Sequence, residues 1–194
     1  QPTEIALLEC HAADIANAVG SGIVMEFGIG SAQKVDPLLR ALQPTTFVAL
    51  EISRSALEDS LKGLAAQHPA TQMLGICCDH SQLQGLPTHP WLKGELRIGF
   101  FPGSSLGNFT PKDAVHLLQQ FRQLLTGGPL LLGLDQPRDP ALLEAAYDDA
   151  AGVSRAYAFK LLKRLKRDLQ GNDEPNNFRY EARWQADQQR IEMA

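Results

Sequence analysis

The chain has 194 residues, of which 44% are hydrophobic and 21% charged, a composition typical of one well-packed globular domain. Its formal net charge of −4 gives no electrostatic reason to expect nucleic acid as a partner, because phosphate binding needs clustered Lys and Arg. No apolar run reaches the length of a membrane span and the first residues are polar, so we expect a cytoplasmic protein that does not associate with membranes.

The cysteines and histidines do not indicate a metal site. Cys10, Cys77 and Cys78 lack the spacing of metal ligands, and the five histidines are scattered along the chain. We therefore expect reduced cysteines, no bound metal and a monomer.

The first glycine turn follows an apolar segment. The run Ile23–Phe27 predicts a buried strand, and it leads into Gly28 and Gly30, where the backbone can turn close to a ligand. The dinucleotide fingerprint requires a third glycine three residues further on, and Gln33 stands there. The acidic Glu26 before Gly-x-Gly is typical of the first motif of S-adenosylmethionine (SAM) methyltransferases. A generic nucleotide site and a structural turn are the alternatives.

Helices are expected on both sides of this turn. The spacing of apolar residues predicts a leading helix from Thr3 to Ala18, capped by Thr3, and a second helix that begins at Asp36 and Pro37. Lys34 lies between the turn and this second helix, where its ammonium could meet the carboxylate of a cofactor. The alternative is a solvated lysine.

The second strand, Thr46–Leu50, ends in an acidic residue. Glu51 follows it about twenty residues after the glycine turn, a position from which a carboxylate can accept both hydroxyls of a ribose. The alternative role is a charge at a helix N-terminus, because Ser53 or Ser55 can start the next helix.

The third strand, Met73–Cys78, is followed by Asp79 and His80. Ligands of open α/β sheets bind at this end of the strands, so Asp79 could accept from an adenine amino group and His80 could line the same pocket. A lone histidine is more often structural, and we do not assign His80 a catalytic role.

The fourth strand, Glu95–Phe101, opens into the glycine-rich loop 102–111. In a doubly wound sheet the strand order reverses between the first and fourth strands, so the loops after these two strands flank the binding crevice. Asn108 in this loop offers an amide that can donate and accept. Its alternative role is that of a turn or capping residue before the following helix.

The rest of the chain predicts a helix over 114–125, a fifth strand at Pro129–Leu134, helices over 139–149 and up to about residue 169, and a hairpin made by 178–184 and 190–193 that joins the edge of the sheet. A basic stripe on the last helix predicts a solvated face. The alternation of strands and helices predicts an α/β, Rossmann-like fold with a mostly parallel, doubly wound sheet and a C-terminal antiparallel hairpin.

Four segments together resemble one family, the SAM-dependent histidine Nα-methyltransferases of ergothioneine biosynthesis. They are Glu26–Ser31 with Lys34, Pro102–Pro111, Ala146–Val153 and Arg190–Met193. The resemblance spans nearly the whole chain, and the last three segments are far more specific than the glycine turn.

The resemblance implies a SAM site and an amino-acid site. The cofactor-binding residues that it implies are Gly28, Gly30, Lys34, Glu51, Asp79 and His80, with Glu51 and His80 standing where the family commonly has Asp and Phe. The substrate-binding residues that it implies are Gly103, Asn108 and Tyr147, and Asn108 is also the expected catalytic residue, aiming the amine.

The implied reaction is methylation of the α-amino group of an amino acid, most simply L-histidine to trimethylhistidine (hercynine). We expect residues 1–194 to form a single methyltransferase domain, truncated at both ends, in which 139–194 contributes to substrate binding. Three alternatives stay open: another small amine as acceptor, a non-catalytic SAM-binding domain, and an NAD(P)-dependent oxidoreductase, for which the third glycine and a Tyr-x-x-x-Lys pair are missing.

Overall fold

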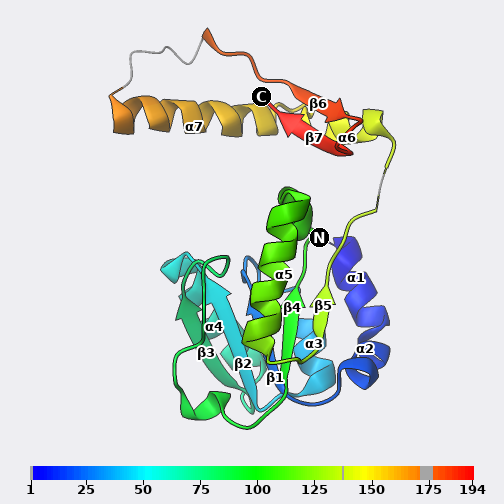
Figure 1. The fold of residues 1–194 in the computed structure, drawn as a ribbon, viewed down its shortest axis with the longest axis vertical. Helices are drawn as coiled ribbons and strands as arrows, with labels where there is room; N and C mark the ends of the chain where they lie inside the picture. Colours follow the sequence, from blue (N-terminus) through cyan, green and yellow to red (C-terminus); the bar gives the residue numbers. More distant parts are fainter. Residues whose placement is uncertain (1, 137, 171–176) are drawn as a thin grey trace. The chain divides into compact units, whose positions relative to one another are not determined.

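The computed structural model describes residues 2–136, 138–170 and 177–194 (Figure 1). The chain forms two compact units, Gln1–Asp135 and Gln136–Ala194, and each contains a sheet. The second unit begins close to residue 139, where the sequence places the start of the substrate-binding part. Whether all 194 residues act as a single domain, and whether 139–194 has that role, stay predictions.

The first unit is built on five parallel strands in the order β3-β2-β1-β4-β5 (Figure 1). The strands are β1 (Ile23–Phe27), β2 (Thr46–Glu51), β3 (Gln72–Cys77), β4 (Arg97–Phe101) and β5 (Leu130–Leu132). All five predicted strands are present: β1 has the predicted ends, and the ends of the other four differ by at most two residues from the predicted ones.

The strand order reverses beside β1. Val24 lies opposite Phe47 of β2 on one side and opposite Ile98 of β4 on the other. The loops that follow β1 and β4 therefore leave the same edge of the sheet in opposite directions, which creates the binding crevice of doubly wound folds. The predicted fold class is confirmed.

Helices cover both faces of this sheet. They are α1 (Pro2–Cys10), α2 (Ala12–Val19), α3 (Asp36–Leu42), α4 (Arg54–Gln67) and α5 (Pro111–Leu125), with short 3-10 turns η1 (Pro90–Leu92) and η2 (Ser105–Asn108). Figure 1 shows α5 in front of the sheet and α3 and α4 behind it. Side chains start two of these helices: Ser53 accepts from the backbone N–H of Ala56 (3.4 Å), and Thr110 accepts from that of Asp113 (3.2 Å).

The prediction of one continuous leading helix over Thr3–Ala18 was wrong, because the helix is interrupted near its middle. The segment forms two helices because the backbone of His11, with φ −107° and ψ 12°, leaves the helical conformation. Thr3 does not cap the first helix, since α1 already begins at Pro2, and proline is well suited to the first turn.

Alternation along the strands divides the core into two halves. Ile23, Met25 and Phe27 of β1 point towards α5, where the ring of Phe27 stacks on that of Phe121 with centroids 3.8 Å apart. Val24 points the other way, into the half of the core that contains residues of α3 and α4. Because both faces are covered, every residue of β1 is buried, and this includes the acidic Glu26.

The second unit contains α6 (Pro140–Tyr147), α7 (Val153–Leu169), β6 (Ala182–Gln185) and β7 (Arg190–Met193). The predicted antiparallel hairpin is present, with Trp184 opposite Ile191. The expectation that it joins the main sheet was wrong, because within the described residues β6 and β7 form a separate two-stranded sheet. The backbone N–H of Trp184 instead donates a hydrogen bond to the Glu144 carboxylate of α6 at 2.8 Å.

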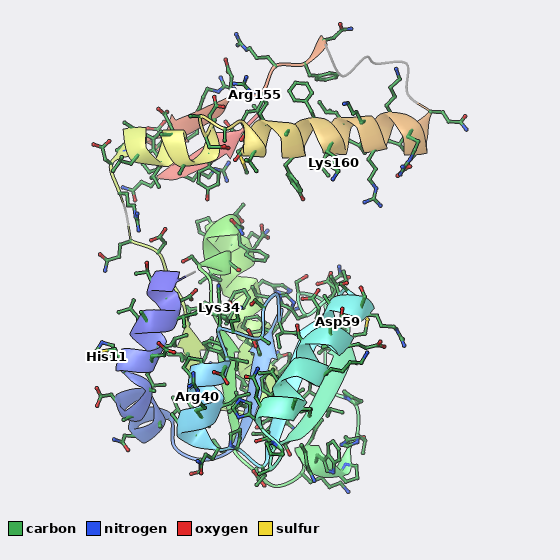
Figure 2. All side chains as sticks on the ribbon, turned by 180° about the vertical axis from the view of Figure 1, so that it is seen from behind. His11, Lys34, Arg40, Asp59, Arg155 and Lys160 are labelled. Atoms are coloured by element: carbon green, nitrogen blue, oxygen red, sulfur yellow. The ribbon has the colours of Figure 1, made fainter. Side chains whose placement is uncertain are left out.

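The start of α7 is fixed by a carboxylate. Asp149 accepts from the backbone N–H groups of Ser154 (2.9 Å) and Val153 (3.0 Å), and these bonds hold the pKa of Asp149 below its usual value. Farther along α7 the basic residues of the predicted stripe are exposed, as expected of a solvated face: Lys160, which Figure 2 labels, Lys163, Arg164 and Arg167. In the part of the chain that the structure describes, no helix has the length and apolar character needed to cross a membrane.

Candidate active site at the carboxyl edge of the sheet

The glycine turn after β1 has the predicted close approach at its first glycine. Gly28 has φ +80°, and its backbone N–H donates to the carbonyl of Leu50 at 2.9 Å. A Cβ on Gly28 would lie 3.3 Å from Cε1 of His80, whereas the surroundings of Gly30 are open within 4 Å. The turn therefore needs glycine at position 28 and leaves room for a ligand beside position 30.

The imidazole ring of His80 lies at this edge of the sheet and packs against two phenylalanine rings. Its centroid lies 5.9 Å from that of Phe101 and 6.0 Å from that of Phe121. Burial lowers the pKa of His80, although Asp79 and Glu51 act in the opposite direction. A neutral imidazole packed on phenylalanines suits the aromatic position that the family resemblance implied, and the structure places it beside Gly28.

Glu51 and Asp79 lie at the ends of neighbouring strands. The backbone carbonyl of Glu51 accepts from the N–H of Cys78 at 3.0 Å, which joins the two chain segments. A side-chain oxygen of Glu51 also accepts from the N–H of Ser53 at 2.9 Å. Both predicted acidic residues thus reach the expected edge, and their contacts with ribose and adenine stay predictions.

Asp79 is already engaged in a local turn. Its carboxylate accepts from the hydroxyl and the backbone N–H of Ser81 (2.6 and 2.9 Å) and from the side-chain amide of Gln82 (2.8 Å). The Ser81 bonds, with a smaller contribution from Gln82, lower the pKa of Asp79 below its usual value. These contacts stabilise the charged form and use much of its capacity as an acceptor.

Lys34 is held in an ion pair by a residue that the sequence did not indicate. Its ammonium lies 2.9 Å from the Glu4 carboxylate, and only 14% of the Lys34 side chain is exposed. The other oxygen of Glu4 accepts from the backbone N–H of Gly103 at 2.7 Å. Glu4 therefore connects α1 to the loops after β1 and β4, and Lys34, which Figure 2 labels, is not a solvated lysine.

Gly103 is the second glycine that the site requires. It has φ +83°, and a Cβ there would lie 2.6 Å from the nitrogen of Lys34. The structure thus brings together Lys34 and Gly103, which are separated widely in sequence and were predicted to bind cofactor and substrate respectively.

Glu26 lies in the same charged cluster but is buried in the sheet. It is 1% exposed, and among the described residues its Oε2 atom has no hydrogen-bond partner. Burial raises the pKa of Glu26 well above its ordinary value, Lys34 opposes this shift, and Glu4 adds to it. The motif therefore places a buried acid, whose neutral form burial favours, within electrostatic reach of the Lys34–Glu4 pair.

Asn108 and Tyr147, the predicted amino-acid contacts, belong to different units. Asn108 is the exposed last residue of η2, and Thr110 rather than Asn108 caps α5. Tyr147 ends α6 in the second unit, where its backbone carbonyl accepts from the hydroxyl of Tyr180 at 2.7 Å. Tyr147 is 40% exposed, and the Tyr180 bond uses its backbone rather than its side chain. The substrate roles of both residues stay predictions.

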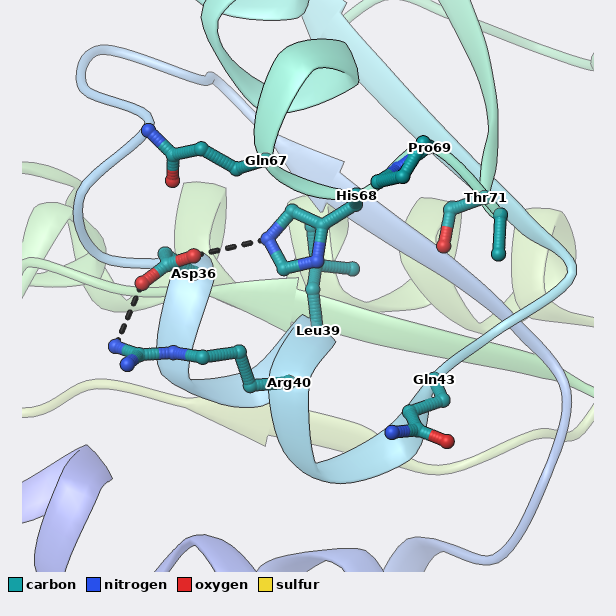
Figure 3. Close-up of a pocket in the computed structure, with 9 residues that line it drawn as sticks. Asp36, Leu39, Arg40, Gln43, Gln67, His68, Pro69 and Thr71 are labelled. Atoms are coloured by element: carbon teal, nitrogen blue, oxygen red, sulfur yellow. Dashed lines mark hydrogen bonds and ion pairs between the residues drawn. The ribbon is translucent and has the colours of Figure 1, made fainter.

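A pocket beside α3 and α4 contains none of the predicted site residues. Figure 3 shows its charged groups satisfying one another: Asp36 contacts Nε2 of His68 at 2.9 Å and the guanidinium of Arg40 at 2.6 Å. These contacts tie the two helices together, and we assign this pocket a structural role. No group of three or more potential metal ligands occurs among the described residues, and a metal-free reaction stays a prediction.

Comparison with known proteins decides the family. A family model described as histidine-specific, SAM-dependent methyltransferase matches residues 1–194. The chain belongs to this family. The histidine Nα-methyltransferase of Mycolicibacterium smegmatis is 31% identical over 98% of this chain and 60% of its own length, and that of Mycobacterium tuberculosis is 29% identical over the same shares. The chain thus spans about 60% of the length of these relatives.

Membership of the histidine-specific methyltransferase family confirms SAM as the cofactor and excludes the oxidoreductase alternative. The chain is also similar to the N-methyltransferase imqF of Aspergillus flavus, 27% identical over 93% of this chain and 52% of that protein. Among solved structures, the glycopeptide N-methyltransferase MtfA in complex with SAM is 24% identical, with a TM-score of 0.46 over 64% of this chain and 48% of that one.

Replacement of the buried acid, Glu26→Gln, should change how stability depends on pH. The raised pKa means that the folded state holds its proton where the unfolded state has lost it, so wild-type stability falls as pH rises from about 4.3 through the folded-state pKa. The Glu26→Gln variant has no carboxyl group at this position, so its stability does not fall with pH for this reason. We expect the difference in unfolding free energy between variant and wild type to shift in favour of the variant as pH rises, measured by urea denaturation from about pH 5 to about pH 8.

The matched control is Glu58→Gln, which removes an exposed carboxylate from α4. Its stability curve should run parallel to that of the wild type. Parallel curves for Glu26→Gln as well would show that Glu26 does not titrate abnormally in the folded protein.

Proposed function

We propose that the protein is a SAM-dependent N-methyltransferase that acts on the α-amino group of an amino acid, with L-histidine as the first candidate and trimethylhistidine as its product. The family match over the whole chain carries this proposal. The names of the mycobacterial relatives support histidine as the acceptor. A small-molecule partner, a monomer and a cytoplasmic location complete the proposal.

The carboxyl edge of the sheet fits the cofactor. The tight Gly28 turn, the open space beside Gly30 and the poorly exposed Lys34 ammonium provide room for a nucleoside and a cation for a carboxylate. Glu51 would accept from the ribose hydroxyls, and Asp79 and His80 would contact the adenine. SAM supplies an electrophilic methyl group on a sulfonium.

The chain's own contribution to the chemistry is positioning. The attacking nitrogen must be a neutral amine in line with the methyl carbon and sulfur, so the site has to favour the deprotonated amine and exclude water. Asn108 carries an exposed amide at the loop after β4, and Tyr147 carries an exposed phenol. Asn108 would aim the nitrogen, while Gly103 and Tyr147 would hold the rest of the amino acid.

A second acceptor class has support from named relatives. The 4-dimethylallyltryptophan N-methyltransferase ifgB of Penicillium roqueforti is 27% identical over 80% of this chain and 49% of that protein. Another amino acid or a small amine is therefore the alternative acceptor.

The proposal is tested first by calorimetric titration with S-adenosylhomocysteine, with NAD as the control, and then by methyl transfer from SAM to histidine and to other amines. We expect binding of S-adenosylhomocysteine alone, followed by turnover of histidine by the full-length protein. Binding without turnover of any amine would identify a non-catalytic SAM-binding domain, and binding of neither ligand would contradict the proposal.

Glu51→Ala should weaken binding of S-adenosylhomocysteine by about 1–3 kcal/mol, because ribose hydroxyls would lose a charged acceptor. The measurement is the same titration. Unchanged affinity would remove Glu51 from the site, and Glu58→Ala on the exposed face of α4 provides the control.

Asn108→Ala should impair binding of the amino-acid substrate and leave cofactor binding largely unchanged, the reverse of the effect expected for Glu51→Ala. We expect the KM for the amino acid to rise about tenfold or more, since an aimed hydrogen bond is lost, while the affinity for S-adenosylhomocysteine stays close to that of the wild type. Steady-state kinetics and calorimetry measure the two quantities. An equal loss in both would contradict an aiming role for Asn108.

A further inference from the structure

Glu4 occupies an unusual place for a residue on a peripheral helix. Its two carboxylate oxygens contact two different loops of the site, one through the Lys34 ammonium (2.9 Å) and one through the Gly103 N–H (2.7 Å). A Cβ added to Gly133, after β5, would also lie 2.8 Å from Oε1 of Glu4. The carboxylate is thus held in a fixed position at the switch point of the sheet.

The Glu4–Lys34 pair keeps capacity for further contacts. A carboxylate can accept about four hydrogen bonds and an ammonium can donate three, and the structure shows two at Glu4. The side chains are 27% and 14% exposed, so the pair is reachable from solvent without being fully hydrated. Charged hydrogen bonds gain strength in such partly dry surroundings.

Glu26 supplies a second observation that points to a ligand. It is 1% exposed and its Oε2 atom is unpartnered, although native proteins rarely leave a buried polar atom unsatisfied. Its electrostatic interactions with both Lys34 and Glu4 place it in the same cluster. The cluster therefore combines one fixed cation, one fixed anion and a buried acid in need of a partner.

We propose that Glu4 determines specificity for the α-amino acid end of the cofactor, by receiving its α-ammonium while Lys34 receives its carboxylate. This inference rests on the proposed function. Glu4 and Lys34 present charges of opposite sign side by side, which matches the two charges that an α-amino acid group carries on one carbon.

The specificity follows from repulsion as well as attraction. A ligand that brings only a carboxylate to Lys34 sets this carboxylate beside that of Glu4, and two anions then compete for one ammonium. An α-ammonium on the same ligand relieves this repulsion by pairing with Glu4. The intact pair should therefore reject plain carboxylates and accept zwitterions.

The test compares three ligands by calorimetry: S-adenosylhomocysteine, its analogue without the α-amino group, and 5′-methylthioadenosine, which lacks both charged groups. The variant is Glu4→Gln, which keeps the size of the side chain and an oxygen that can accept from Gly103. The control is Glu9→Gln, on the same helix, where a 55% exposed carboxylate lies 3.6 Å from Arg40 and away from the cluster.

Wild type and Glu9→Gln should prefer S-adenosylhomocysteine to the deaminated analogue. In Glu4→Gln this preference should shrink by about tenfold, as expected for one lost charge-assisted hydrogen bond, while the affinity for 5′-methylthioadenosine stays within about twofold of that of the wild type. An unchanged preference in Glu4→Gln would overturn the inference.

A merely structural role has a different signature. Equal weakening of all three ligands by Glu4→Gln would show that Glu4 only supports the loops, and would also overturn the inference. If the wild-type protein failed to bind S-adenosylhomocysteine, the proposed function would fall as well, so the two failures are distinguishable.

Discussion

The burial of β1 on both faces is the constraint on which the site depends. α5 covers one face of β1, and α3 and α4 cover the other. The strand ends at the carboxyl edge of the sheet, where Gly28 turns the chain with φ +80°. Because the strand order reverses beside β1, the loop after β4 lies across the crevice from this turn. Gly103 of that loop has φ +83° and lies so close to Lys34 that a Cβ at this position would displace the Lys34 ammonium.

Charge within this crevice is balanced by residues from three distant segments. Lys34 is paired with Glu4, and Glu26 is buried close enough to interact electrostatically with both. A partly buried ion pair of this kind costs desolvation free energy, so it is weak evidence for a contribution to stability. The pair lies at the edge of the sheet where we propose that the cofactor binds, and among the described residues Glu26 keeps an unpartnered carboxyl oxygen.

The sequence predicted those features that depend on local pattern. Apolar runs bounded by glycines and acids located all five parallel strands, and the reversal beside β1 followed from general rules of doubly wound sheets. It could not indicate Glu4, because no periodicity relates a residue in the first turn of α1 to Lys34 or Gly103. It also missed the break at His11 and the separate hairpin sheet, both of which depend on contacts and backbone angles that a hydrophobic pattern does not encode.

The motif Ala146–Val153 holds Tyr147, a predicted substrate contact, through structural interactions. Asp149 caps α7, Gly152 has φ +67°, and the Tyr147 carbonyl is bonded to Tyr180 of the chain segment leading into β6. These contacts use the backbone of Tyr147 and leave its phenol outside the hydrogen bond. A tyrosine fixed through its backbone at a helix end loses little additional freedom when its side chain binds a ligand. The rest of the motif therefore fixes the backbone of the residue for which a substrate contact is predicted.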